Sequence, residues 1–121
     1  MNQLIIDRSK WRTGGTSLND KFGETKLLND KGMMCCLGFY CLQIGNKTEH
    51  EIFDIALPET LETNEGIESL VTSELKHTEF TERVVFINDG ESWGNEFREI
   101  QIHEQFKKIN VDVKFVNEYP K

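Results

Sequence analysis

The sequence predicts a small α+β fold, with an N-terminal hairpin-like region, three helices and a C-terminal strand. Three observations lead to this prediction. The chain has 121 residues, of which 37% are apolar, so residues 1–121 can bury one core and form a single domain. Apolar residues recur at helical spacing in three segments. The last segment alternates apolar and polar residues, as a strand does.

The N-terminal third of the chain is predicted to be extended. Between Trp11 and Gly32, glycines separate short apolar pieces, which is typical of extended chain and hairpin turns. The first helix is expected to follow directly, from Met34 to Ile44, because apolar residues recur there at spacings of three and four. Asp30 or Asn29 is a candidate for its N-cap, and the following Gly-Asn pair is typical of a helix end.

Residues 48–76 are predicted to form a loop-rich connection, since Pro58 interrupts any regular element there. A second helix is expected to begin near Thr78, a capping residue, and to stop at Gly90. Its apolar stripe would consist of Phe80, Val84 and Ile87.

A third helix is predicted over residues 96–109. It has two apolar faces, so we expect it to pack between other elements. One face carries Phe97 and Ile100, and the other carries Ile102, Phe106 and Ile109. Residues 111–116 then alternate as a C-terminal strand would.

The charge and the apolar pattern narrow the classes of partner. The formal charge is -7, which disfavours extended binding to a phosphate backbone and favours basic protein surfaces, although negative charge also serves solubility alone. The longest apolar stretch, Met33 to Leu42, is about half of a membrane span, so we expect no membrane partner. The first residues lack the features of a secretory signal, and we expect the protein to act in the cytoplasm with reduced cysteines.

Cys35 and Cys36 allow two interpretations. A thiol at a helix N-terminus, with a histidine as base, could make the protein a cysteine-dependent hydrolase. Cysteine is also a small apolar residue, and we favour tight packing of both side chains in the interior. Adjacent cysteines on a helix point about 100° apart, so we predict no metal site, and no other cofactor is indicated.

Asn88 and Asp89 lie between two predicted helices. We expect their side chains to satisfy backbone groups at the helix ends and to fix the angle between these helices. The alternative is that Asp89 and Glu91 form an acidic pair for acid–base catalysis.

Two tryptophans and two arginines are candidate binding residues. Trp11 and Trp93 lie beside glycine-bearing turns and could serve as exposed anchors for a protein partner, with core packing as the simpler alternative. If Arg12 or Arg98 lay at the rim of a pocket beside a tryptophan, the same region could bind a small nucleotide.

Several short motifs, in their order along the chain, carry a resemblance. These are Trp11 with Gly14 and Gly15, the Cys-Cys-Leu-Gly segment from Cys35 to Gly38, Leu57 and Pro58, Asn88 and Asp89, and finally Phe97 and Ile100. In this respect the chain resembles a family of small uncharacterised proteins encoded by tailed bacteriophages and prophages. It departs from the family pattern at residues 93–96, which separate the serine from Phe97, and at Glu104.

The resemblance implies a setting, the infection of a bacterial cell, but no reaction and no ligand. Together with the acidic charge, it leads us to expect a non-enzymatic accessory protein that binds a host protein, with an anti-defence or host-takeover role. Sequestration of a small nucleotide signal is the alternative function, followed by cysteine-dependent hydrolysis. Cys35, Cys36, Gly38, Asn88 and Asp89 are then expected to be structural residues.

Overall fold

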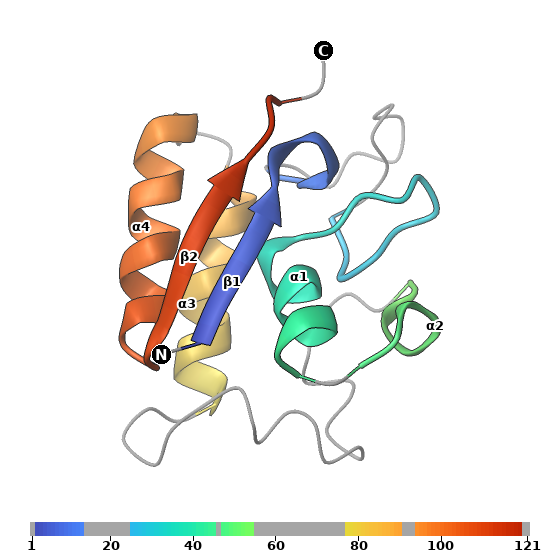
Figure 1. Cartoon of the computed structure of the whole chain (residues 1–121), viewed down its shortest axis with the longest axis horizontal. Helices are drawn as coiled ribbons and strands as arrows, with labels where there is room; N and C mark the ends of the chain where they lie inside the picture. The colour runs from blue at the N-terminus through green and yellow to red at the C-terminus, as the bar shows by residue number, and fades with distance from the viewer. Residues whose placement is uncertain (1, 14–24, 46, 55–76, 91–93, 120–121) are drawn as a thin grey trace.

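A computed structural model describes residues 2–13, 25–45, 47–54, 77–90 and 94–119. These residues form an α+β fold in which helices pack on a two-stranded sheet (Figure 1). In chain order the elements are β1 (Asn2–Asp7), a 3₁₀ helix η1 (Arg8–Lys10), α1 (Cys36–Gln43), α2 (Glu49–Ile52), α3 (His77–Asp89), α4 (Asn95–Lys107) and β2 (Val111–Val116). None of the helices in this part of the chain is long and apolar enough to cross a membrane.

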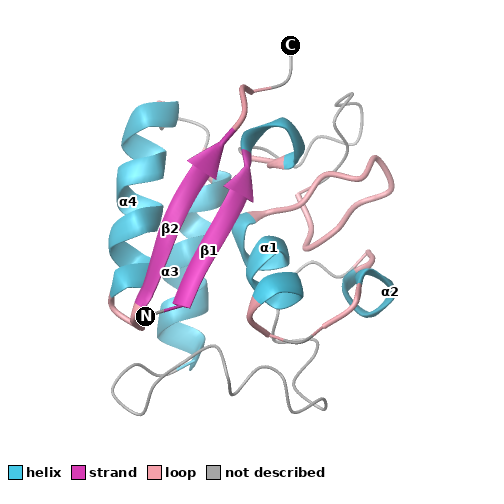
Figure 2. Cartoon of the chain, viewed as in Figure 1, coloured by secondary structure: helices cyan, strands magenta, loops and turns pink. Residues whose placement is uncertain are grey.

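The two strands come from opposite ends of the chain and run parallel. Asn2 is opposite Val111 and Asp7 is opposite Val116, so both strands end at the same edge of the sheet (Figure 2). On β1 the side chains of Leu4 and Ile6 are buried, and their neighbours point to solvent. The sequence predicted β2 with its observed bounds, but β1 was not predicted.

Among the described residues, the helices pack on one face of the sheet (Figure 1). Contacts join α1 to β1 and α4 to β2. The outer edge of β1 is bound by one side chain, because the amide of Gln43 accepts from the Ile5 N–H at 2.8 Å and donates to the Ile5 carbonyl at 2.7 Å. This pair reproduces the hydrogen bonds of a neighbouring strand and fixes the C-terminal end of α1 to the sheet.

Helix α1 begins two residues later than predicted, and neither Asn29 nor Asp30 caps it. The side chain of Asn29 instead accepts hydrogen bonds from the backbone of Lys31 and Met33, both at 2.9 Å, in the preceding turn. Cys35 occupies the N-cap position without a side-chain hydrogen bond. The expected cap was wrong because the turn uses the asparagine oxygen before the helix starts.

Helix α3 ends at Asp89, as its sequence predicts, and its stripe of Phe80, Val84 and Ile87 is buried. The ring of Phe80 meets that of Phe106 from α4 edge-on, with centroids 5.3 Å apart. Tyr40 from α1 stacks on the same Phe106 ring at 5.6 Å. These three rings join the helices in the centre of the core.

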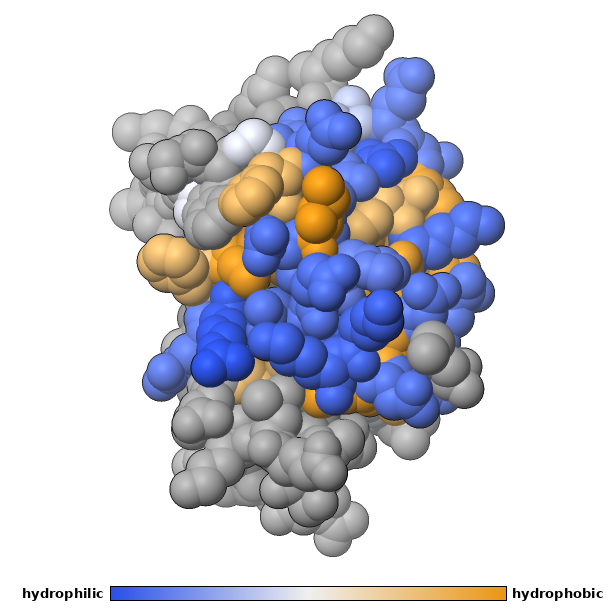
Figure 3. All heavy atoms as spheres, turned by 90° about the vertical axis from the view of Figure 1, so that its left-hand side faces the viewer, coloured by the Kyte–Doolittle hydropathy of each residue, from blue (hydrophilic) through white to orange (hydrophobic). Residues whose placement is uncertain are grey.

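The prediction that both apolar faces of α4 are packed was wrong. Ile102 and Phe106 are buried, but Phe97 and Ile100 are 49% and 53% exposed. The reason is the position of α4 at one side of the molecule (Figure 1), where it contacts α3 and β2. On this side of the molecule, apolar atoms lie at the surface among polar ones (Figure 3).

Helix α2 lies where only loop was expected, and its signal is a capping box in which Thr48 and Glu51 bond each other's backbone N–H. It adds a fourth helix to the three predicted. Residues 14–24 of the predicted hairpin-like region, and residues 55–76 of the loop-rich connection, lie outside the described residues.

Candidate functional site

Two of the motifs that carry the resemblance, the segment from Cys35 to Gly38 and the pair Asn88 and Asp89, meet in the interior around the side chain of Asn88. Its oxygen accepts the indole N–H of Trp11 at 2.6 Å and the backbone N–H of Cys36 at 3.0 Å. Its nitrogen donates to the Arg12 carbonyl at 3.0 Å and to a carboxylate oxygen of Asp89 at 2.9 Å. The amide thus makes all four of its hydrogen bonds and ties the end of α3 to the start of α1 and to residues 11–12.

The cysteines beside this junction are poorly suited to nucleophilic chemistry. Cys35, Cys36 and Cys41 are free and buried. Burial raises the pKa of the Cys35 thiol to about 12 and also raises that of Cys36, so both stay protonated at neutral pH. These features support interior packing over a thiol enzyme.

The space between the two motifs is too small for a substrate. Cys35, Cys36, Asn88 and Asp89 line a cavity of about 10 Å³, which is the volume of a single water at most. Burial also raises the pKa of Asp89, and the hydrogen bond from Asn88 only partly offsets this. Glu91, the second member of the acidic pair considered above, lies outside the described residues.

Trp11, Arg12 and Arg98, for which the sequence suggested binding roles, are buried, with 2%, 6% and 3% exposure. Arg98 donates to the Ile87 carbonyl at 3.2 Å and also to the Gly90 carbonyl, both at the end of α3. It therefore fixes the angle between α3 and α4, a role that we predicted for Asn88 and Asp89. Burial keeps these three side chains from acting as exposed anchors or as the rim of a nucleotide pocket. Trp93 lies outside the described residues.

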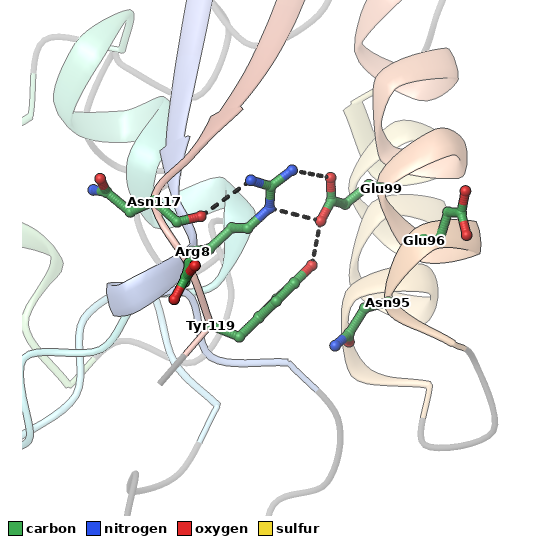
Figure 4. A pocket seen from close by; sticks show the side chains of 7 residues that line it. Arg8, Asn95, Glu96, Glu99, Asn117 and Tyr119 are labelled. Carbon is green, nitrogen blue, oxygen red and sulfur yellow. Dashed lines mark hydrogen bonds and ion pairs between the residues drawn. The ribbon is translucent and has the colours of Figure 1, made fainter. Parts of the chain in front are cut away.

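A pocket of about 420 Å³ lies elsewhere, at the edge where β1 and β2 both end (Figure 4). It is a shallow depression, largely open to solvent, and it lies at the carboxyl edge of parallel strands, where α/β proteins commonly bind ligands. The residues that line it come from the ends of both strands and from the first turns of α4. They are Arg8, Asn95, Glu96, Glu99, Asn117, Glu118 and Tyr119.

An ion pair between Arg8 and Glu99 forms the floor of this pocket. The guanidinium donates from Nε to Oε2 at 2.9 Å and from Nη2 to Oε1 at 2.7 Å, a bidentate geometry. A third donor, Nη1, bonds the Asn117 carbonyl at 3.0 Å. Arg8 therefore connects the end of β1 to α4 and to the residues that follow β2.

Residues 117–119, which follow β2, also line the pocket. Tyr119 donates its hydroxyl to Glu99, and its ring stacks on Trp11 with centroids 6.2 Å apart. Asn117 donates its side-chain N–H to Asp7 at 2.9 Å. Burial alone would raise the pKa of Glu99, but the hydrogen bonds from Arg8 and Tyr119 outweigh it, so the pKa is lowered and the carboxylate stays ionised.

The pocket has an excess of negative charge. Three carboxylates line it against one guanidinium, and that guanidinium is already paired with Glu99. Within the described part of the chain, neither Glu96 nor Glu118 is paired with a basic side chain. The described residues also contain no group of three His, Cys, Asp or Glu side chains placed to hold a metal ion. Such a pocket attracts a cationic group and repels a phosphate.

None of the residues that line this pocket was predicted as a site residue. Asn95 and Glu96 lie in the segment where the chain departs from the family pattern, and Glu99 lies in the predicted third helix, but no function was assigned to them. Arg8 and Glu99 are 91 positions apart and Tyr119 is 20 positions from Glu99. The available signal was weak: polar residues follow the ends of two strands, and one of these strands was itself not predicted.

No protein-family model matches the chain, and no curated protein or solved structure matches it closely enough to indicate a relationship.

Proposed function

We propose that this protein is a non-enzymatic accessory protein of phage origin, which binds a basic segment of a host protein in the host cytoplasm. The observation that carries the proposal is the charge of the pocket at the carboxyl edge of the sheet. Glu96 and Glu118 are exposed there, and the only arginine is paired with Glu99. An anti-defence or host-takeover role is the biological setting that the sequence resemblance suggests.

Two further properties support binding over catalysis. The chain carries a net charge of -7, which draws a basic surface toward it over a distance of roughly 8–10 Å at physiological salt. The cysteines and the Asn88–Asp89 pair, the residues that could have supplied chemistry, are occupied with internal hydrogen bonds and packing.

Affinity capture from bacterial cells that express the tagged protein tests this proposal. The wild-type chain should recover one host protein reproducibly, and recovery should fall as salt is raised. The variant Glu96→Gln with Glu118→Gln should lose most of this recovery. A matched control, Glu82→Gln with Glu104→Gln, removes the same charge from exposed positions on α3 and α4 outside the pocket and should retain it.

Two outcomes would count against the proposal. If the wild-type chain recovers no partner and its expression has no effect on growth or infection, the binding function is wrong. If both double variants lose recovery equally, net charge rather than the pocket determines binding.

A further inference from the structure

Tyr119 forms one wall of the pocket, and its ring is bound by three side chains of the same protein. We define the phenol site as Arg8, Trp11 and Glu99, the three side chains that hold this ring. The Trp11 ring stacks on it with an interplanar angle of 27°. The Arg8 guanidinium lies 5.8 Å from its centroid, and a Glu99 oxygen accepts its hydroxyl. Each group recognises a different feature of a phenol: its flat face, its electron-rich ring and its O–H.

The site is fixed independently of Tyr119. Trp11 is held by its hydrogen bond to Asn88 and by the ring of Phe115, at 5.3 Å. Arg8 and Glu99 hold each other through two hydrogen bonds. The receptor groups would therefore keep their positions if the ring left, which makes the site preorganised for another phenol.

The segment that carries Tyr119 is only lightly attached. Asn117 and Glu118 are exposed, and Tyr119 itself is partly exposed. Apart from the tyrosine contacts, the attachments of this segment are the two hydrogen bonds of Asn117 to Arg8 and Asp7, within the described residues. The pairing of β1 with β2 ends at Val116, before this segment, so release of the segment does not disturb the sheet register.

We infer that the phenol site is an exchangeable tyrosine-binding site, at which a tyrosine of a partner displaces Tyr119. The phenol site borders the negative pocket, since Arg8 and Glu99 belong to both. A partner segment that carries a tyrosine beside basic residues would fill the phenol site and the negative pocket together. The basic residues of this partner rest on the proposed function, whereas the binding of a tyrosine at the phenol site does not.

The test uses full-length Tyr119→Ala and the probe N-acetyl-tyrosinamide, with N-acetyl-phenylalaninamide as the probe that lacks only the hydroxyl. Binding is followed by the NMR signal of the Trp11 indole N–H. The tyrosine probe should bind Tyr119→Ala at least tenfold more tightly than it binds wild type, where the tethered ring competes at millimolar effective concentration. It should also bind at least threefold more tightly than the phenylalanine probe. Tyr119→Phe keeps a ring on Trp11 but lacks the hydroxyl, so it should bind the tyrosine probe more tightly than wild type does and less tightly than Tyr119→Ala does.

NMR relaxation dispersion of wild type provides a second measurement that does not depend on the folding of a variant. The Trp11 indole N–H and the amides of residues 117–119 should share one microsecond-to-millisecond exchange process, as expected if the tail leaves the phenol site in the native state, and the amides at the centre of β2 should lack it. Absence of this shared process would overturn the inference. So would equal binding of the two probes, or no binding to a folded Tyr119→Ala chain. None of these results depends on a host partner, so failure here is separate from failure of the proposed function.

Discussion

The indole N–H of Trp11 donates to the side-chain oxygen of Asn88 at 2.6 Å, across 77 residues of sequence. The same oxygen accepts from the backbone of Cys36, the first residue of α1. One amide thus replaces the missing N-cap side chain of α1 and fixes the tryptophan that supports the phenol site. The hydrogen bond between Asn88 and Trp11 thus connects the interior junction to the surface pocket, because the Trp11 ring stacks on Tyr119.

Replacing Asn88 should therefore be costly. Asn88→Ala leaves the Trp11 and Cys36 N–H groups and the Arg12 carbonyl without their partner in a buried position, so we expect a loss of about 3 kcal/mol in the free energy of unfolding. Urea denaturation measures this loss. Asn95→Ala, at the rim of the pocket, serves as control and should cost less than about 1 kcal/mol. Equal losses in the two variants would show that Asn88 is not the junction we describe.

Gly38 is expected to be intolerant of any side chain. A Cβ there would lie 1.9 Å from the carbonyl oxygen of Leu27, a backbone atom that cannot move without shifting the chain. Gly38→Ala should cost about 3 kcal/mol or more, as other overpacked sites do. Gly94→Ala meets no atom within 4 Å and should cost below about 1 kcal/mol, so thermal unfolding of the pair separates close packing from glycine replacement in general.

The sequence could predict those parts of the fold that depend on local pattern. The stripe of α3 and the alternation of β2 each lie within one segment, and both were predicted correctly. The packing of α4 was not, because two apolar faces look alike in sequence whereas only one lies against β2 and α3. The pairing of β1 with β2, which joins the two ends of the chain, has no local signature of its own.

The candidate site could not be predicted from the sequence for a related reason. Arg8 and Glu99 become neighbours only when β1 lies beside β2 and α4 packs against it. The residues that attracted attention, Cys35 and Asn88, were noticed because they belong to unusual short motifs. Such motifs also arise where packing is tight, and the structure places both residues in the interior. Burial, which separates structural from functional residues here, depends on the whole fold.

The thiols are expected to be unreactive in the native protein. With the pKa of Cys35 near 12, only about one molecule in ten thousand carries its thiolate at pH 8. Burial raises the pKa of the Cys41 thiol to about 12 as well. A disulfide reagent at pH 8 should therefore label the three cysteines only as fast as the protein unfolds, and all three at once in denaturant. Rapid labelling of one cysteine in the native protein would instead support the hypothesis of a cysteine-dependent hydrolase. In that case Cys35→Ala or Cys36→Ala should abolish an activity, whereas packing predicts only lower thermal stability.

The last prediction concerns acid stability. The pKa of Glu99 is lower in the folded chain than its usual value of 4.5, since Arg8 and Tyr119 bond the ionised form. A group of this kind contributes stability above pH 4.5 that is lost as the pH falls through the lowered folded value. Asp7 acts in the same direction, because hydrogen bonds from Ser9 and Asn117 lower its pKa. Asp89 acts in the opposite direction, since burial raises its pKa and acid relieves the buried charge.

Glu99→Gln separates these contributions. The variant should be less stable than wild type at pH 7, and the difference should shrink as the pH falls below 4.5 and through the lowered folded pKa, where the wild-type carboxylate takes up its proton. Glu104→Gln, an exposed glutamate on the same helix and outside the pocket, should leave the whole pH profile unchanged. The measurement is the midpoint of urea unfolding at a series of pH values. A constant difference between Glu99→Gln and wild type would mean that Glu99 contributes through packing, and that its ion pair with Arg8 adds nothing to the stability of the pocket floor.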